Sequence, residues 1–157
     1  MNKNFLKHFF GITVVKRRSN VLRRSRIVVR KPTLKWVTKK SLAQKEDYLT
    51  YKLSALVLTT ERIHHFNTQY NFRFKNISIR NQTTRWGSCS SKGNLSFNYL
   101  IIRLPKHLAD YIVVHELCHL GEFNHSAKFW DLVSRADPEY KKHVAELKKI
   151  RIEELVK

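Results

Sequence analysis

Apolar residues recur every seven positions along a stretch that begins near residue 41. The series is Leu42, Leu49, Leu56, Ile63 and Tyr70, with Leu53 and Phe66 between its members. Because seven residues make about two turns of a helix, these side chains lie along one face. Ser41 followed by Gln44 is a capping box, which is typical of a helix start. The pattern predicts one long helix over residues 41–71, with this stripe facing the core.

The period changes after residue 71 to the alternation typical of strands. Ile77 and Ile79 alternate with polar residues over 75–80, which predicts a half-buried strand. Further strands are predicted over 85–90 and 94–100, and the turn-forming residues 91–94 between them indicate a hairpin. Leu95, Phe97 and Tyr99 are expected to share one face of the last strand. We therefore expect a small antiparallel sheet.

Three helices are predicted in the rest of the chain. The first covers 105–120, where Pro105 suits a first helical position and Gly121 can take the left-handed conformation that ends a helix. Ser126 is expected to cap the second helix, and the third is predicted from Pro138 through Lys157. Before residue 41 the pattern is weaker, and β-branched runs over 21–37, above all at 27–29, indicate one or two short strands.

His115, Glu116 and His119 form the clearest chemical motif in the sequence. Histidines four residues apart lie on the same face of a helix, so their imidazoles can bind one metal ion. Glu116 lies about 100° round the helix from His115, where its carboxylate can reach a water molecule without binding the metal. The H-E-x-x-H arrangement is typical of zinc with glutamate as a general base.

His125 is the candidate for a third ligand, because it follows the predicted helix end at Gly121 and the chain can turn back there. A catalytic zinc takes three protein ligands and leaves one position open for water. Cys89 is a less favoured alternative. Cys118 is expected to face away from the two histidines as a small buried residue.

Positive charge is concentrated at the start of the chain. The net charge is +19, and the first 45 residues hold 14 lysine and arginine residues and no acidic residue. This segment favours a polyanion such as DNA or RNA, with Arg17, Arg18, Arg23, Arg24 and Arg26 as candidate contacts. The alternatives are a solvated face that promotes solubility, or an organellar transit peptide.

The cell compartment is predicted from cysteine content and hydropathy. The chain has 2 cysteines, Cys89 and Cys118, which make no disulfide framework and favour a reducing, cytoplasmic location. No stretch approaches the roughly 18 apolar residues of a membrane span, so no membrane partner is expected.

Two sequence blocks resemble the YgjP-like metallopeptidase family, which is related to the SprT and WLM-type proteases. One block covers residues 85–98 and the other covers 115–130. The resemblance implies a zincin-like α+β fold, in which a small antiparallel sheet packs on a long helix and on the active-site helix. It also implies His115, His119 and His125 as zinc ligands and Glu116 as the catalytic base. The amino-terminal part departs from the family, because it is shorter and very basic.

Together these observations predict a single domain over 1–157, with a basic amino-terminal segment at about 1–40. The predicted function is a zinc-dependent metallopeptidase that hydrolyses protein or peptide substrates, with the basic segment placing it near nucleic acid. Arg85 is a candidate for stabilising the oxyanion or for positioning substrate, and its alternative role is a structural salt bridge.

Two other functions stay open. A zinc-dependent nucleotide or phosphoester hydrolase would use the same water and the same positive charge. A basic nucleic-acid-binding module with a structural zinc is disfavoured, since a structural site normally has four protein ligands and needs no base such as Glu116.

Overall fold

The computed structural model describes residues 39–155, apart from the side chains of residues 39–41 and 153. They belong to one compact unit, Thr38–Lys157. The candidate nucleic-acid contacts at positions 17–26 and the strand predicted at 27–29 lie outside the described residues. The described elements are α1 (Lys39–Tyr70), β1 (Asn76–Arg80), β2 (Gly87–Cys89), β3 (Asn94–Asn98), η1 (Tyr99–Arg103), α2 (Lys106–Cys118), α3 (Ala127–Ala136), α4 (Tyr140–Leu147) and η2 (Ile152–Leu155).

The predicted long helix is confirmed as α1, but its apolar stripe is buried over only part of its length. The helix begins at Lys39, before the predicted cap, and ends where Asn71 takes a left-handed φ of 52°. Ile63 is fully buried, whereas Leu49 and Leu53 are 62% and 69% exposed. The expectation that the whole stripe faces the core is therefore wrong. In this part of α1 the core face is formed by Tyr48, Tyr51 and Ala55, which lie roughly 100° or more round the helix from Leu49.

The predicted hairpin is confirmed, but the sheet is mixed. The strand order is β1-β3-β2, with β2 antiparallel and β1 parallel to the central β3. The β2–β3 turn contains Gly93 with a φ of 76°, as its turn sequence predicts. Ile79 pairs with Phe97 and Ile77 with Leu95, so the apolar residues are in register. The sequence predicts each strand, but the parallel pair follows from the placement of β3 between the other two.

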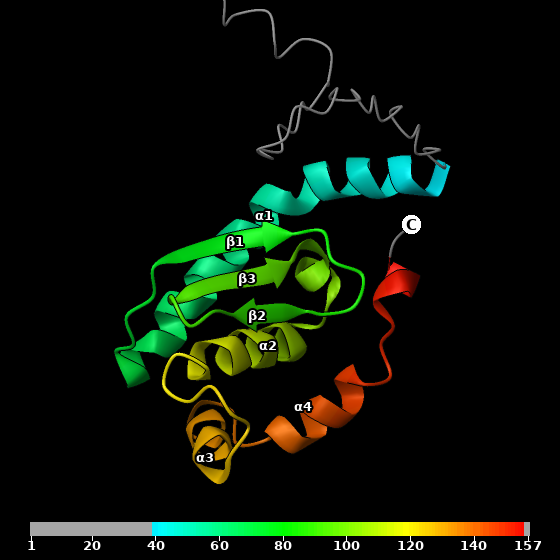
Figure 1. Ribbon diagram of the computed structural model, residues 1–157. Helices are drawn as coiled ribbons and strands as arrows, with labels where there is room; N and C mark the ends of the chain where they lie inside the picture. Colours follow the sequence, from blue (N-terminus) through cyan, green and yellow to red (C-terminus); the bar gives the residue numbers. More distant parts are fainter. Residues whose placement is uncertain (1–38, 156–157) are drawn as a thin grey trace, which may run out of the picture. The chain divides into compact units, whose positions relative to one another are not determined.

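Helix α2 packs against α1 and β2 and forms the centre of the core. Its buried residues include Leu108, Val113, Val114 and Leu117. Figure 1 shows α1 passing behind the three strands and α2 lying along β2. This packing confirms the predicted α+β class and brings β2 beside the helix that contains the H-E-x-x-H motif.

The ends of α2 differ in detail from the prediction. Pro105 precedes the first helical residue instead of occupying it, and the helix ends at Cys118. Gly121 does not take the expected left-handed conformation, since the only glycine of residues 39–155 with a positive φ is Gly93. A Cβ on Gly121 would lie 2.7 Å from Cζ of Phe72, so this glycine makes room for a ring.

The carboxyl-terminal elements pack on α2 through α3 and α4. Ser126 caps α3 as predicted, because its Oγ accepts a hydrogen bond from the backbone N–H of Phe129. The continuous helix predicted from Pro138 to Lys157 is wrong, since α4 ends at Leu147 and the short helix η2 follows. The turn between them brings Ile152 into the core, which a straight helix would not do. No helix in residues 39–155 is long and apolar enough to span a membrane.

Candidate metal centre

Three histidines converge on one point at the end of α2. His115 comes from the last turn of α2, His119 caps the end of that helix, and His125 comes from the loop before α3. Their candidate ligand nitrogens all lie within 4.8 Å of one another, and Nε2 of His115 is 3.1 Å from Nε2 of His125. Two nitrogens that bind one tetrahedral zinc at about 2.0–2.1 Å are about 3.3 Å apart. The distance between His115 and His125 therefore matches two ligands of a single zinc ion.

The other ring nitrogens of two of these histidines have their own partners. Nδ1 of His119 is 3.1 Å from the carbonyl oxygen of Glu122, to which it can only donate. Nδ1 of His115 is 3.3 Å from the hydroxyl of Tyr111. When Nδ1 donates its proton, Nε2 presents a lone pair, which is the form that binds a metal. Sequence analysis missed Tyr111, although its position one turn before His115 was a usable signal.

Burial favours the neutral form of the His115 and His119 imidazoles in the metal-free chain. Burial, with smaller effects of His119 and His125, lowers the pKa of His115 to about 3. Burial also lowers the pKa of His119. Neutral imidazole is the form that binds metal ions, so the site is ready for a metal at neutral pH.

The ring of Phe129 packs against all three histidines of the cluster. Its ring is fully buried, and its centre lies 4.9 Å from the ring of His115, 4.5 Å from His119 and 4.8 Å from His125. Trp130 stacks on His125 with ring centres 5.7 Å apart. These contacts limit how far the three imidazole rings can rotate and hold the turn that contains His125.

Glu116 lies beside the cluster, between α2 and strand β2. Its side chain is only 7% exposed. Burial raises the pKa of Glu116 to about 8, and the positive charge of Arg85 acts in the opposite direction. Arg85 itself is exposed. Coulombic attraction therefore links Arg85 to Glu116, which agrees with either role considered for Arg85.

Asn98 fixes the loop that brings Arg85 and β2 to this place. Its side chain is fully buried, and its amide donates to the carbonyl oxygens of Gln82 at 2.7 Å and of Arg85 at 3.2 Å. Its backbone N–H donates to the carbonyl of Trp86 at 2.8 Å. Asn98 ends the first of the two sequence blocks, so this block positions a loop and a strand against α2.

The remaining candidates lie outside the cluster. Among residues 39–155, the only group of histidine, cysteine or acidic residues with metal spacing is His115, His119 and His125. Cys89 is half-buried, and burial together with the charge of Glu116 raises its pKa to about 11, so it is a protonated thiol. Cys118 is buried, as predicted. His64 and His65 are exposed on α1.

The sequence was compared with models of known protein families. The YgjP-like metallopeptidase domain matches residues 10–150, a range that includes both sequence blocks and all the histidines of the cluster. This chain belongs to the YgjP-like metallopeptidase family. The predicted family and the predicted enzyme class, a zinc-dependent hydrolase of the metallopeptidase kind, are therefore confirmed. The family implies a metal ion, typically zinc, and a protein or peptide substrate.

Solved structures resemble this YgjP-like chain in fold. The metallopeptidase zymogen abylysin of Pyrococcus abyssi has a TM-score of 0.53 and 21% identity, over 58% of this chain and 92% of abylysin. The metallopeptidase zymogen jannalysin of Methanocaldococcus jannaschii has a TM-score of 0.51 and 22% identity, over 58% of this chain and 94% of jannalysin. At this identity the likeness establishes the zincin-like fold alone. Comparison with curated proteins gives no match.

Proposed function

We propose that this YgjP-like protein is a zinc peptidase in which His115, His119 and His125 bind the metal and Glu116 is the general base. The convergence of the three imidazoles supports this most directly, because it leaves a tetrahedral ion with one open position. A bound zinc ion would supply a Lewis acid that polarises the scissile carbonyl and makes water easier to deprotonate.

Glu116 accepts a proton from the attacking water and returns it to the leaving amine. Its burial supports this role, since a carboxylate with a raised pKa is a stronger base than one in water. It also directly follows His115 on α2 and is not among the candidate ligands. Tyr111 and the carbonyl of Glu122 keep the ligand histidines in the tautomers that this arrangement needs.

Strand β2 is the proposed holding surface for an extended peptide. It is an edge strand, because β3 pairs with it on one side only in the described sheet. A peptide that adds to such an edge gains backbone hydrogen bonds without a requirement for a particular sequence. Arg85, just before β2 and exposed, is the proposed partner of the oxyanion or of the substrate.

Glu116→Gln tests the proposed base. Glutamine is nearly isosteric, so the fold and the bound zinc should be retained, while turnover of an unfolded protein substrate should fall at least about 100-fold. Glu61→Gln, an exposed substitution on α1, is the matched control and should keep full turnover. Wild-type turnover in a zinc-loaded Glu116→Gln protein would exclude Glu116 as the base.

His125→Ala tests the third ligand. About one zinc per chain is expected in the native protein and a strong loss in this variant, measured by elemental analysis. His64→Ala, an exposed histidine outside the cluster, should keep its zinc. Full zinc in His125→Ala would remove His125 from the site. The same zinc-loaded native protein, assayed against nucleoside triphosphates, separates the peptidase from the alternative phosphoester hydrolase.

We also propose that the basic amino-terminal segment binds DNA or RNA, which would place the peptidase near nucleic acid. The support is its charge: 14 lysine and arginine residues without an acidic residue in the first 45. Changing Arg17, Arg18, Arg23 and Arg24 to glutamate should weaken binding and reduce its salt dependence. Glutamate at the exposed Lys141, Lys142, Lys148 and Lys149 gives the same change in net charge. An equal loss of nucleic-acid binding in both variants would show that the net charge of the protein, and not a site in the segment, causes the binding.

A further inference from the structure

Gly87 lies at the closest approach between strand β2 and the active-site helix. It pairs with Phe97 across the hairpin. A Cβ built on Gly87 would lie 2.6 Å from Cγ, 2.8 Å from Cδ and 2.7 Å from Oε1 of Glu116. Carbon atoms in real structures do not approach this closely. Any side chain at position 87 therefore requires Glu116 or the strand to move.

The backbone of Gly87 does not itself require glycine. Gly93 is the only glycine of residues 39–155 with a positive φ, so Gly87 has a conformation that other residues adopt freely. A glycine inside a strand weakens that strand, because it has more conformational freedom to lose and no side chain to pack. The benefit of glycine here is space, and that space is filled by Glu116.

Glu116 has little freedom to avoid an added methyl group. A Cβ at position 87 would contact Cγ and Cδ of Glu116, which are in the middle of its side chain, as well as one carboxylate oxygen. The residue is inside α2 and only 7% exposed, and its neighbours Leu117 and Val113 are fully buried. A Cβ at position 87 would therefore displace the carboxylate.

We propose that Gly87 is a positioning residue, whose missing side chain sets where the carboxylate of Glu116 stands relative to the histidine cluster. This inference rests on the proposed function of Glu116 as the base. A displacement of about 1 Å in a reacting group can cost about 100-fold in rate. Gly87→Ala should therefore lower kcat by about 100-fold, with KM and zinc content close to those of the native protein.

A different role for Gly87 predicts a different result. If glycine only lets a substrate backbone approach the edge of β2, Gly87→Ala should raise KM and leave kcat close to native. Ser78→Thr is the matched control, because it adds one methyl group to strand β1, at the opposite edge of the sheet from the proposed substrate strand. It should keep the native kcat. A raised KM with native kcat in Gly87→Ala overturns the proposal.

A double-mutant cycle tests the contact without using activity. Glu116→Ala removes Cγ, Cδ and the carboxylate, so Gly87→Ala should lower the melting temperature in the native background and leave it nearly unchanged in the Glu116→Ala background. If Gly87→Ala fails to fold, recovery of folding in the double variant supports the contact equally well. An equal loss of stability in both backgrounds, or failure of both proteins to fold, overturns it. This readout does not depend on turnover. If Glu116→Ala kept its activity, Glu116 would not be the general base, and the cycle would still test the contact between Gly87 and Glu116.

Discussion

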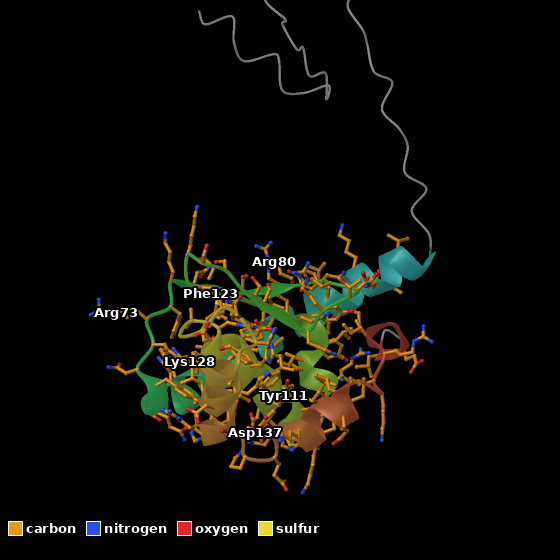
Figure 2. All side chains as sticks on the ribbon, turned by 60° about the horizontal axis from the view of Figure 1, so that its bottom comes forward. Arg73, Arg80, Tyr111, Phe123, Lys128 and Asp137 are labelled. Atoms are coloured by element: carbon orange, nitrogen blue, oxygen red, sulfur yellow. The ribbon has the colours of Figure 1, made fainter. Side chains whose placement is uncertain are left out.

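Tyr111 is one helical turn before His115, and its hydroxyl is the partner of His115 Nδ1 at 3.3 Å. Figure 2 shows Tyr111 on α2 above Asp137, which belongs to the turn after α3. Burial, together with the charges of Asp137 and Glu116, raises the pKa of Tyr111 to about 12. Tyr111 therefore stays a neutral hydroxyl and can accept the Nδ1 proton that fixes the metal-binding tautomer.

Tyr111→Phe should weaken zinc binding by about 10- to 100-fold, the usual effect of removing a partner of a ligand histidine. The ring is retained, so the melting temperature of the metal-free protein should change little. Zinc affinity is measured by competition with a chelator. Tyr70→Phe is the control, because the hydroxyl of Tyr70 donates to the carbonyl of Leu132 and contacts no ligand histidine. Equal zinc affinity in both variants would contradict the role of Tyr111.

Tyr99 predicts a pH dependence that is independent of the metal site. Burial, with the charge and hydrogen bond of Asp47, raises the pKa of Tyr99 to about 12, from about 10 in an unfolded chain. The folded protein therefore holds a proton that the unfolded chain loses between pH 10 and 12. The contribution of neutral Tyr99 is complete below pH 10 and is lost as the pH rises toward 12.

Tyr99→Phe should cost about 1 kcal/mol of unfolding free energy at pH 8, since it loses one hydrogen bond. Asp47 keeps its ion pair with Arg103, so no buried charge is left alone. Above pH 10 the difference from the native protein should shrink, as measured by urea unfolding over a pH series. A constant difference from pH 8 to pH 12 would show that Tyr99 titrates normally.

At the residue scale, the sequence predicts side chains whose relation is local. His115 and His119 are recognisable because one turn of helix brings them together, and Cys118 because its position turns it away. Gly87 and Asn98 are not recognisable in the same way. Their roles arise only when β2 packs against α2 and when the loop before β2 crosses β3, and no local spacing encodes either contact.

At the element scale, α1 is one helix with two environments. In its first half, Tyr48 and Tyr51 pack against the core, whereas Leu42, Leu49 and Leu53 lie on another face and are exposed. Periodicity predicts where a helix has an apolar face but not how much of that face the rest of the fold covers. The mixed sheet has a similar explanation, since alternation predicts strands but not their order in space. The prediction extended the last helix too far because it treated a series of apolar residues as one stripe. These residues do not lie on one helical face: Leu147, Ile150, Ile152 and Leu155.

Buried and exposed apolar residues of α1 should respond differently to truncation. Ile63→Ala removes a fully buried side chain and should cost about 2–5 kcal/mol. Leu53→Ala removes a side chain that is 69% exposed and should change stability by less than about 1 kcal/mol, helped by the high helix propensity of alanine. Denaturant unfolding of both variants measures the difference. Equal losses would mean that Leu53 is covered in solution.

At the scale of the whole molecule, the metal site joins elements that are otherwise held mainly by side-chain packing. Two ligands belong to α2 and one to the loop that leads into α3, so a bound ion would connect the core to the carboxyl-terminal elements. Any ligand that binds only the folded state stabilises it by mass action.

Zinc at 100 times its dissociation constant should add about 2.7 kcal/mol, which is about 10 °C in melting temperature for a unit of this size. The measurement is a thermal melt of chelator-treated protein with increasing zinc. His125→Ala should lose most of the shift, and His64→Ala should keep it. A melting temperature that is independent of zinc in the native protein would contradict a site that requires the folded chain.

The three ligand histidines differ in how far their backbone can move. His115 and His119 are part of a helix whose other face is the core, whereas His125 is an exposed residue of a short loop. Only His125 can therefore leave by a local movement of the backbone. A resident ion would exchange with the surrounding solution through a state with two ligands, at a rate set by the opening of residues 120–125 and not by global unfolding. The affinity for the ion and the rate of its exchange are thus separate properties here: all three histidines determine the first, and the opening of the loop determines the second.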